Sequence, residues 1–343
     1  MRDFWAPNKS YNFLRCYIDW CTRRSFTSIE THGTLPPMDD GAWFIVSNHT
    51  HTLMDALVIL QMRREGTAFG ARADVFRNPV AARFLHFCKI VPLARKDRER
   101  PEEVAHNRET MGVIDQVVAH GVPFCLFPEG RHRPMHSLLP LRRGIAMMAF
   151  RSAAQRPTKI LPIGLEYSSW FHFRGRASVN IGEPLDVNAF AASLEPGIDD
   201  STRDSALQEE LFKRLSSLIL YIPDDEHYDE RLAEIKAQNP PCSRFWRILL
   251  TVVTFPLFLI AAVLALPMWA IAEFMCKFKI KDTAWNNTVR FGVKMVGTPV
   301  FFLLWAIIGF ILLPWWGALL LLAAFLPSYS LFYDWLNLLW DRT

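Results

Sequence analysis

Residues 42–60 read AWFIVSNHTHTLMDALVIL, an apolar run, a polar turn and a second apolar run. The first run, Trp43 to Ser47, is short and follows an Asp-Asp-Gly sequence, which predicts a buried strand. The second run keeps apolar residues at helical spacing from Leu53 to about Arg64, which predicts a helix. His49 and His51 are therefore expected in a strand-to-helix turn.

A histidine followed by an aspartate within one or two helical turns suits proton transfer. The imidazole of His49 would take a proton, and the carboxylate of Asp55 would fix its tautomer and stabilise the imidazolium. The sequence contains no G-x-S-x-G motif, so the base would activate a hydroxyl group of the substrate. The alternative interpretation makes His49 and His51 polar turn residues and Asp55 a surface helix residue.

The composition points to a membrane. Of the 343 residues, 51% are hydrophobic, with 12 Trp and 26 Phe, which exceeds the norm for soluble proteins. The excess lies in two uncharged blocks, residues 248–272 and 295–333, and each is long enough to cross a bilayer. We therefore expect a linker at 222–247 and a membrane region at 248–340, with the number of spans left open; buried core helices are the alternative.

The charge balance favours lipid and phosphate over nucleic acid. A net charge of +4 suits anionic lipid surfaces and phosphate-bearing substrates. No nucleic-acid-binding motif is present, so nucleic acid is not expected as a partner. The six cysteines include no C-x-x-C pair, which favours reduced thiols and a catalytic domain facing the cytoplasm. His132 and His136 are four residues apart but lack further ligands at suitable spacing, so no metal is expected.

The N-terminal segment, residues 1–28, is aromatic, with apolar residues at helical spacing and arginines elsewhere. It is expected to associate with the membrane by lying in the bilayer interface. Packing against the domain is the equally open alternative.

Short and long apolar runs alternate from residue 29 to residue 221, which predicts an α/β domain with a mixed, partly parallel sheet. The expected strands are Trp43–Ser47, Ala68–Gly70, Ile90–Leu93, Pro123–Phe127, Ile160–Tyr167 and Ala177–Ile181. The expected helices are Leu53–Arg64, Val80–Phe87, Glu102–His120, Arg143–Arg151 and Leu207–Leu220. Ligands of such folds bind at the carboxyl ends of strands, where His49 falls.

Four further motifs lie within predicted strands or at their ends. Arg95 comes after the strand ending at Leu93, and residues 127–133 read FPEGRHR after the next apolar run. The sequences LPIG at 161–164 and IGEP at 181–184 come later. Gly130 permits a tight turn, and the guanidinium groups nearby suit a phosphate.

Taken in this order, the His/Asp turn, the arginine and the F-P-E-G, L-P-I-G and I-G-E-P motifs resemble the glycerolipid acyltransferase family. Its members include lysophosphatidic acid acyltransferases and glycerol-3-phosphate acyltransferases. The resemblance runs from about Ile29 to Asp186 and implies an acyltransferase fold. It also implies that His49 is the general base and that Asp55 orients it. Five residues separate the two where the most familiar pattern has four, so His51 with Asp55 is the second choice.

The resemblance also assigns substrate-binding positions. Those expected near the acceptor phosphate or in the third motif are Arg95, Glu129, Gly130, Arg131 and Arg133. The family's usual Thr-Arg is replaced here by Arg131-His132, so the phosphate role passes to Arg131 or Arg133. Pro162 and Gly164 match the fourth motif, which lies beside the acyl-donor site in the family.

The implied activity is transfer of an acyl group from acyl-CoA or acyl-carrier protein to the hydroxyl of 1-acyl-glycerol 3-phosphate, making phosphatidic acid in phospholipid biosynthesis. Backbone amides near the His/Asp turn would stabilise the oxyanion, and no cofactor is expected. Glycerol 3-phosphate or another lipid, such as an amino-acid lipid, is the alternative acceptor. A non-catalytic lipid-binding membrane protein is the rival from another class.

Overall fold

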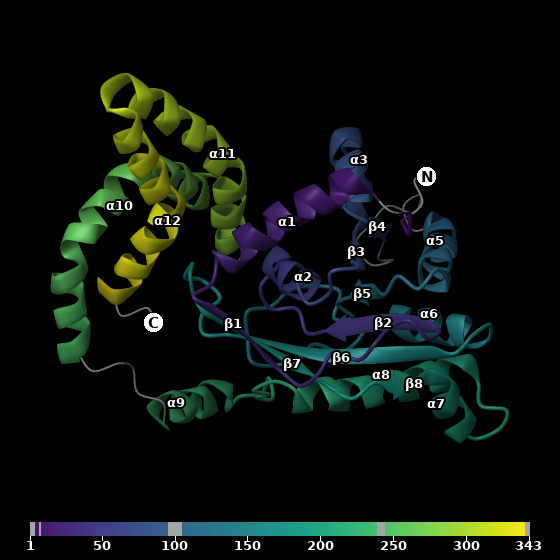
Figure 1. The fold of residues 1–343 in the computed structure, drawn as a ribbon. Coiled ribbons are helices and arrows are strands. Elements are labelled where there is room, and N and C mark those ends of the chain that lie inside the picture. Colours follow the sequence, from purple (N-terminus) through teal and green to yellow (C-terminus); the bar gives the residue numbers. More distant parts are fainter. Residues whose placement is uncertain (1–3, 7, 95–104, 239–243, 340–343) are drawn as a thin grey trace.

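The computed structural model describes residues 4–6, 8–94, 105–238 and 244–339 of the chain. A twisted sheet lies at the centre, with helices on both faces and three long helices at one side (Figure 1). The strands are β1 (Ser28–His32), β2 (Ala42–Ser47), β3 (Ala68–Arg72), β4 (Ile90–Leu93), β5 (Phe124–Leu126), β6 (Thr158–Tyr167), β7 (Arg176–Ile181) and β8 (Leu185–Asp186).

The helices divide between the sheet and the C-terminal region. Those around the sheet are α1 (Lys9–Arg23), α2 (Leu53–Leu60), α3 (Pro79–Phe87), α5 (Asn107–Ala119), α6 (Gly144–Ala153), α7 (Val187–Ser193), α8 (Asp200–Ser217) and α9 (Tyr228–Gln238). The long C-terminal helices are α10 (Arg244–Phe278), α11 (Asn286–Leu312) and α12 (Trp315–Leu339). Two short 3₁₀ turns, η1 (Ala73–Phe76) and η2 (Thr283–Trp285), precede α3 and α11.

The sheet is mixed, as the sequence predicted. Its strand order is β1-β7-β6-β2-β5-β3-β4, with β8 paired to β6. Strand β2 runs parallel to β5 and β6, and β3 runs parallel to β4 and β5. Strand β6 is antiparallel to β7 and β8. The parallel part therefore brings the carboxyl ends of β2 and β5 together at one edge.

Strand β2 is buried along its whole length because both faces of the sheet are covered. Trp43 and Ile45 join the hydrophobic core that includes α2 and parts of the C-terminal helices. Phe44 and Val46 point the other way, into the core formed with α5, α6 and α8. This alternation fixes the register of the turn that follows β2.

The observed elements differ from the predicted ones mainly at edges and ends. Strand β1 was not predicted, because its sequence SIETH has little apolar character and lies half-exposed or exposed at the sheet edge. Helix α2 ends at Leu60 rather than near Arg64, and the guanidinium of Arg15 donates there to the carbonyl oxygens of Leu60 and Arg63. Part of the segment expected as a linker, residues 222–247, forms α9 and the start of α10.

The second uncharged block forms two helices, because the chain breaks at Leu313 and Pro314 between α11 and α12. Helices α10, α11 and α12 are each long and apolar enough to cross a membrane. The base of the α11–α12 hairpin is tied by Lys294 Nζ, which lies 3.3 Å from Ser330 Oγ. Many of the large apolar side chains on these helices are exposed, so the buried-core alternative does not describe them.

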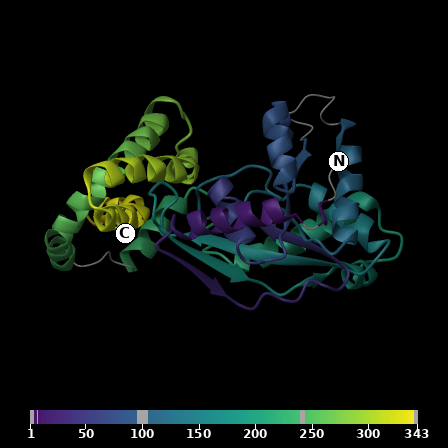
Figure 2. The same ribbon diagram turned by 45° about the horizontal axis from the view of Figure 1, so that its top comes forward.

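Helix α1 packs on the domain and still exposes an aromatic side chain. The hydroxyl of Tyr17 donates to the carbonyl oxygen of Met295 on α11 at 2.6 Å, whereas Phe13 is 81% exposed. In Figures 1 and 2, α1 lies across the sheet between α3 and the long C-terminal helices.

Candidate active site

The site lies where β2 and β5 end. Val46 pairs with Leu126 in parallel register, so the turn that begins at Asn48 and the turn that begins at Phe127 leave the sheet side by side. The side chain of Asn48 anchors the first turn, because it exchanges two hydrogen bonds with the backbone of Leu165 on β6, at 2.9 and 2.7 Å.

His49 and Asp55 form a close pair. Nδ1 of His49 lies 2.7 Å from Oδ2 of Asp55. The carboxylate is fully buried, whereas the imidazole is 19% exposed. A carboxylate at Nδ1 favours the tautomer with its proton on that nitrogen, which leaves the lone pair of Nε2 free to accept a proton.

Asp55 is held from several sides. The backbone amides of Thr50 and His51 donate to Oδ2 at 3.0 and 2.8 Å, and the hydroxyl of Tyr167 donates to Oδ1 at 2.7 Å. These bonds keep a buried charge satisfied and fix the carboxylate plane. The amides of Thr50 and His51 already donate to Asp55. These two amides are therefore not the ones expected to stabilise the oxyanion.

Glu129 supports the turn from the neighbouring strand. Its Oε1 accepts from the backbone amide of His49 at 2.8 Å, and its Oε2 accepts from the amide of Leu139 at 2.9 Å. Burial raises the pKa of this carboxyl, while the two amide donors work in the opposite direction. Gly130 follows with φ +71°, a conformation that favours glycine, and its amide closes the turn onto the carbonyl of Phe127 at 3.0 Å. Glu129 therefore positions the backbone of His49 and does not hydrogen-bond to its imidazole ring.

His51, the second choice for the base, occupies a different environment. Its ring is 2% exposed, and its Nε2 accepts a hydrogen bond from Nδ2 of Asn287 at 2.8 Å. Burial lowers the pKa of His51 to about 4, so the ring is neutral at pH 7. With its Nε2 occupied and its ring enclosed, His51 is placed to position the turn, whereas His49 is placed to meet a substrate.

The first turn of α11 reaches the site, which the sequence did not indicate. Asn287 is 2% exposed and also donates to the carbonyl oxygen of Trp170 at 2.8 Å. Thr288 Oγ1 lies 2.6 Å from Thr52 Oγ1, and Thr52 has a φ of +52°, which a β-branched residue rarely adopts. Because 236 residues separate each pair along the chain, no local pattern could have revealed this contact.

The mouth of the site is lined by aromatic rings. The imidazole of His49 stacks on Phe127 with ring centroids 4.3 Å apart. His132 stands edge-on to His49 at 5.8 Å and to Trp285 at 5.7 Å. Nε2 of His132 lies 3.2 Å from a carboxylate oxygen of Asp282, just before η2. The segment between α10 and α11 therefore forms one wall of the site.

The expected phosphate-binding arginines differ in their surroundings. Arg131 is exposed and makes no ion pair with any described residue. Arg133 is paired with Asp224 and also donates to the hydroxyl of Ser137. Arg95 lies outside the described residues. Among the two arginines that the structure describes, Arg131 has the guanidinium available for an anion.

Pro162 and Gly164 lie in β6, where they are buried. A Cβ on Gly164 would stand 2.3 Å from the carbonyl oxygen of Leu218, so only glycine allows the chain after α8 to approach the strand. This packing accounts for the glycine of the fourth motif independently of any ligand.

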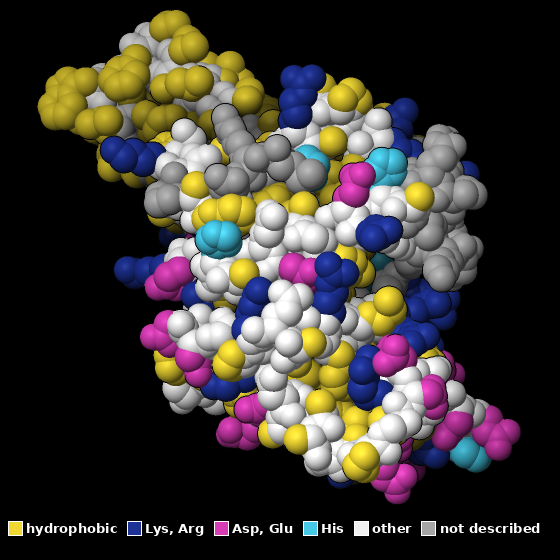
Figure 3. Space-filling view, turned by 90° about the vertical axis from the view of Figure 1, so that its right-hand side faces the viewer, with side chains coloured by type: hydrophobic (Ala, Val, Ile, Leu, Met, Phe, Trp, Pro, Cys, Tyr) yellow, Lys and Arg dark blue, Asp and Glu magenta, His cyan; other side chains and the backbone are white. Residues whose placement is uncertain are grey.

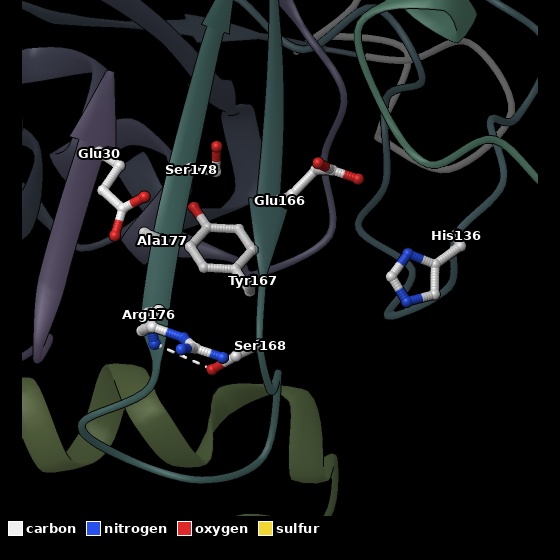
Figure 4. Close-up of a pocket in the computed structure, with 8 residues that line it drawn as sticks. All are labelled: Glu30, His136, Glu166, Tyr167, Ser168, Arg176, Ala177 and Ser178. Carbon is white, nitrogen blue, oxygen red and sulfur yellow. Dashed lines mark hydrogen bonds between the residues drawn. The ribbon is translucent and has the colours of Figure 1, made fainter. Parts of the chain in front are cut away.

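A hollow of about 310 Å³ opens at the carboxyl end of β6 and the start of β7, and His49 is not among the residues that line it. Figure 4 shows its lining: Glu30, His136, Glu166, Tyr167, Ser168, Arg176, Ala177 and Ser178. The ring of Tyr167 forms part of its wall, while the Tyr167 hydroxyl reaches Asp55.

Within the described ranges, no three His, Cys, Asp or Glu side chains are grouped to hold a metal ion.

A comparison with known families matches the part of the chain that forms most of the sheet and the candidate site. The family model described as Acyltransferase matches residues 28–166. That span contains His49, Asp55, Glu129 and Gly164. The match supports, over this part of the chain, the resemblance to the glycerolipid acyltransferase family that the motifs indicated.

Particular relatives are similar over limited spans. An uncharacterised acyltransferase of Schizosaccharomyces pombe is 29% identical over 109 residues, which cover 31% of this chain and 16% of that protein. Glycerol-3-phosphate O-acyltransferase 2 of Saccharomyces cerevisiae is 28% identical over 139 residues, covering 40% of this chain and 18% of that protein. The chain thus spans less than a fifth of the length of either relative. The crystal structure of a 1-acyl-sn-glycerophosphate acyltransferase from Thermotoga maritima aligns with a TM-score of 0.42 and 20% identity, over 63% of this chain and 85% of that one.

Proposed function

We propose that this protein is a membrane-bound O-acyltransferase that moves an acyl group from a thioester donor, acyl-CoA or acyl-carrier protein, to the hydroxyl of 1-acyl-glycerol 3-phosphate. The observation that carries the proposal is the pairing of a partly exposed imidazole, His49, with a fully buried carboxylate, Asp55, at 2.7 Å. A protein that only binds lipid has no need of such an oriented base, which argues against the non-catalytic alternative.

In the proposed reaction, Nε2 of His49 takes the proton from the acceptor hydroxyl as its oxygen attacks the thioester carbonyl carbon. The new C–O bond forms, the C–S bond breaks, and the imidazolium returns its proton to the leaving thiolate. Asp55 stabilises the imidazolium while it exists and holds the ring in one orientation. The products are the ester and the free thiol of the donor.

The phosphate of the acceptor needs a positively charged side chain close to His49. Arg131 supports this role because it is exposed, follows the turn that buttresses His49, and presents a planar fork suited to a phosphate. Arg133 would first have to leave Asp224. Arg95 stays an expectation from the resemblance.

Glycerol 3-phosphate is the second candidate acceptor, because a Saccharomyces cerevisiae relative carries the name of a glycerol-3-phosphate O-acyltransferase. Both candidates carry a phosphate and a free hydroxyl, so the same base and the same arginine would serve either.

Purified full chain in detergent, given labelled acyl-CoA or acyl-carrier protein, would separate these acceptors. The panel holds 1-acyl-glycerol 3-phosphate, glycerol 3-phosphate and a lyso-lipid that carries an amino acid in place of phosphate. We expect transfer to 1-acyl-glycerol 3-phosphate to be fastest. Transfer confined to the phosphate-free acceptor would contradict the role given to Arg131, and absence of transfer to every acceptor would favour the lipid-binding alternative.

A further inference from the structure

The segment from η1 to α3 presents apolar side chains to the outside of the domain. Val75 is 43% exposed, Val80 is 71% exposed and Phe84 is 49% exposed. Arg77 and Arg83, also exposed, stand among them. We call these five residues the α3 patch. Large apolar side chains flanked by arginines are typical of surfaces that rest at the boundary between lipid headgroups and acyl chains.

Helix α1 packs against α3 beside the α3 patch. The rings of Tyr11 and Phe87 stand edge to face with centroids 6.2 Å apart, which joins the start of α1 to the end of α3. Lys89 lies over the ring of Tyr11, with its Nζ 4.9 Å from the centroid. Further along α1, Phe13 is 81% exposed. Tyr11 and Lys89 are themselves buried, so they pack the start of α1 firmly against the end of α3, and Phe13 adds an exposed apolar side chain on α1.

The other end of α1 meets the candidate membrane region. Tyr17 donates to the carbonyl oxygen of Met295, and from the next residue onward α11 is largely uncovered, with Val296 62% exposed and Ile311 74% exposed. Residues 295–333 carry no charge, so the nearest charged residues on both helices of the α11–α12 hairpin lie at its base. The level of Met295 is therefore where a bilayer surface would lie.

The arrangement in space agrees with this reading. Helix α3 and the α11–α12 hairpin project to the same side of the molecule, with α1 between them (Figures 1 and 2). Figure 3 shows an apolar projection at its upper left and a surface of mixed charged and apolar side chains elsewhere. Helix α8 covers the opposite face of the sheet (Figure 1).

We propose that the α3 patch rests on the surface of a lipid bilayer that contains anionic headgroups, as a second membrane contact beside the C-terminal helices. Val80 and Phe84 lie at the edge of the acyl chains, and Arg83 lies among the headgroup phosphates. The contact turns α1 and α3 towards the bilayer and α8 away from it. A second copy of this chain is the competing occupant.

This orientation also sets the depth of the catalytic turn. Thr288, which touches that turn, precedes Met295 by seven residues, which is roughly 10 Å along the helix axis. The turn that carries His49 therefore lies on the water side of the bilayer surface, at headgroup distance. If His49 acts as proposed above, a lipid acceptor reaches it without leaving the bilayer.

Photo-crosslinking in the full chain tests the contact without relying on activity. Benzoylphenylalanine replaces Val80 or Phe84 in protein reconstituted into vesicles of phosphatidylcholine and phosphatidylglycerol, and lipid adducts are measured by mass spectrometry. The matched control is the same replacement at Glu209, an exposed position on α8. Each variant is first compared with the unmodified protein in its melting temperature, so that misfolded samples are set aside.

We expect at least ten-fold more lipid adduct at positions 80 and 84 than at 209. We also expect Arg83→Glu to lower the yield at position 80 several-fold in vesicles with phosphatidylglycerol, because it reverses a charge beside anionic headgroups. Equal lipid adduct at 80 and 209 would overturn the proposal. A main product of two crosslinked chains would also overturn it and would assign the patch to a second copy.

Discussion

The side-chain amide of Asn287 donates to Nε2 of His51 across 2.8 Å, and this contact joins a C-terminal helix to the turn that carries His49. Neither partner is more than 2% exposed, so the bond is shielded from water. The candidate base is thus positioned by two distant parts of the chain: Glu129 holds its backbone from β5, and Asn287 holds its neighbour from α11.

Asn287→Ala removes this bond and leaves the carbonyl of Trp170 without its donor. We predict a fall in kcat of about ten-fold with KM little changed, because the loss of a buried hydrogen bond of about 1–3 kcal/mol loosens the turn without touching the acceptor site. Steady-state kinetics of the purified protein checks this. Asn286→Ala is the matched control, since Asn286 is less buried and makes no side-chain bond to the turn within the described ranges; equal losses in the two variants would contradict the role of Asn287.

Tyr167→Phe deletes the hydroxyl that donates to Oδ1 of Asp55 and keeps the ring. We expect kcat to fall by about ten-fold, because a hydrogen bond to a charged group is worth about 1.5–3 kcal/mol and part of this orients the carboxylate. Initial rates at saturating acceptor measure the effect. Tyr221→Phe serves as the comparison, because no described residue receives a hydrogen bond from that hydroxyl. An unchanged kcat in Tyr167→Phe would show that Tyr167 does not help to orient Asp55.

Glu129→Gln breaks one of two bonds, since an amide can accept at one position only while both partners, the amides of His49 and Leu139, are donors. The buried mismatch should lower the free energy of unfolding by about 1–3 kcal/mol and kcat by at least ten-fold. Thermal unfolding and rate assays on one preparation test both. Wild-type rates in the glutamine variant would show that the backbone of His49 needs no anchor.

The neutral state of His51 predicts a pH dependence of stability. Because burial lowers the pKa of His51 to about 4, below its value of about 6.5 in the unfolded chain, the unfolded state binds the extra proton first as the pH falls. Stability is thus fully present above pH 6.5 and is lost towards pH 4, by about 3 kcal/mol in total. Melting temperatures at pH 7 and pH 4.5 should drop less for His51→Gln than for the wild type. An identical drop would indicate that His51 does not resist protonation.

Local patterns predicted much of the fold. The alternation along β2 and the helical spacing after Leu53 placed the His/Asp turn correctly, because both elements are buried and their periodicity records the burial. Strand β1 was missed because an exposed edge strand needs no apolar face. At the end of α2, Arg15 from another helix donates to the carbonyl oxygen of Leu60. The α11–α12 hairpin turns at Leu313-Pro314.

The candidate site divides in the same way. His49, Asp55 and Glu129 follow strands in the sequence and converge because β2 and β5 are parallel neighbours. Tyr167 and Asn287 could not be predicted, because their contacts join residues 112 and 236 positions apart. The sequence also could not show that Arg133 is paired with Asp224 while Arg131 stays exposed.

The rate of acyl transfer by His49→Ala, measured beside His51→Gln in the same membrane preparation, tests the central claim most directly. Loss of a positioned general base costs on the order of 10²–10⁴ in rate. We predict a loss in this range for His49→Ala and a loss of less than about ten-fold for His51→Gln, with both proteins folded as judged by their melting temperatures. Transfer by His49→Ala at the wild-type rate, or a greater loss in the His51 variant, would contradict the assignment of His49 as the base.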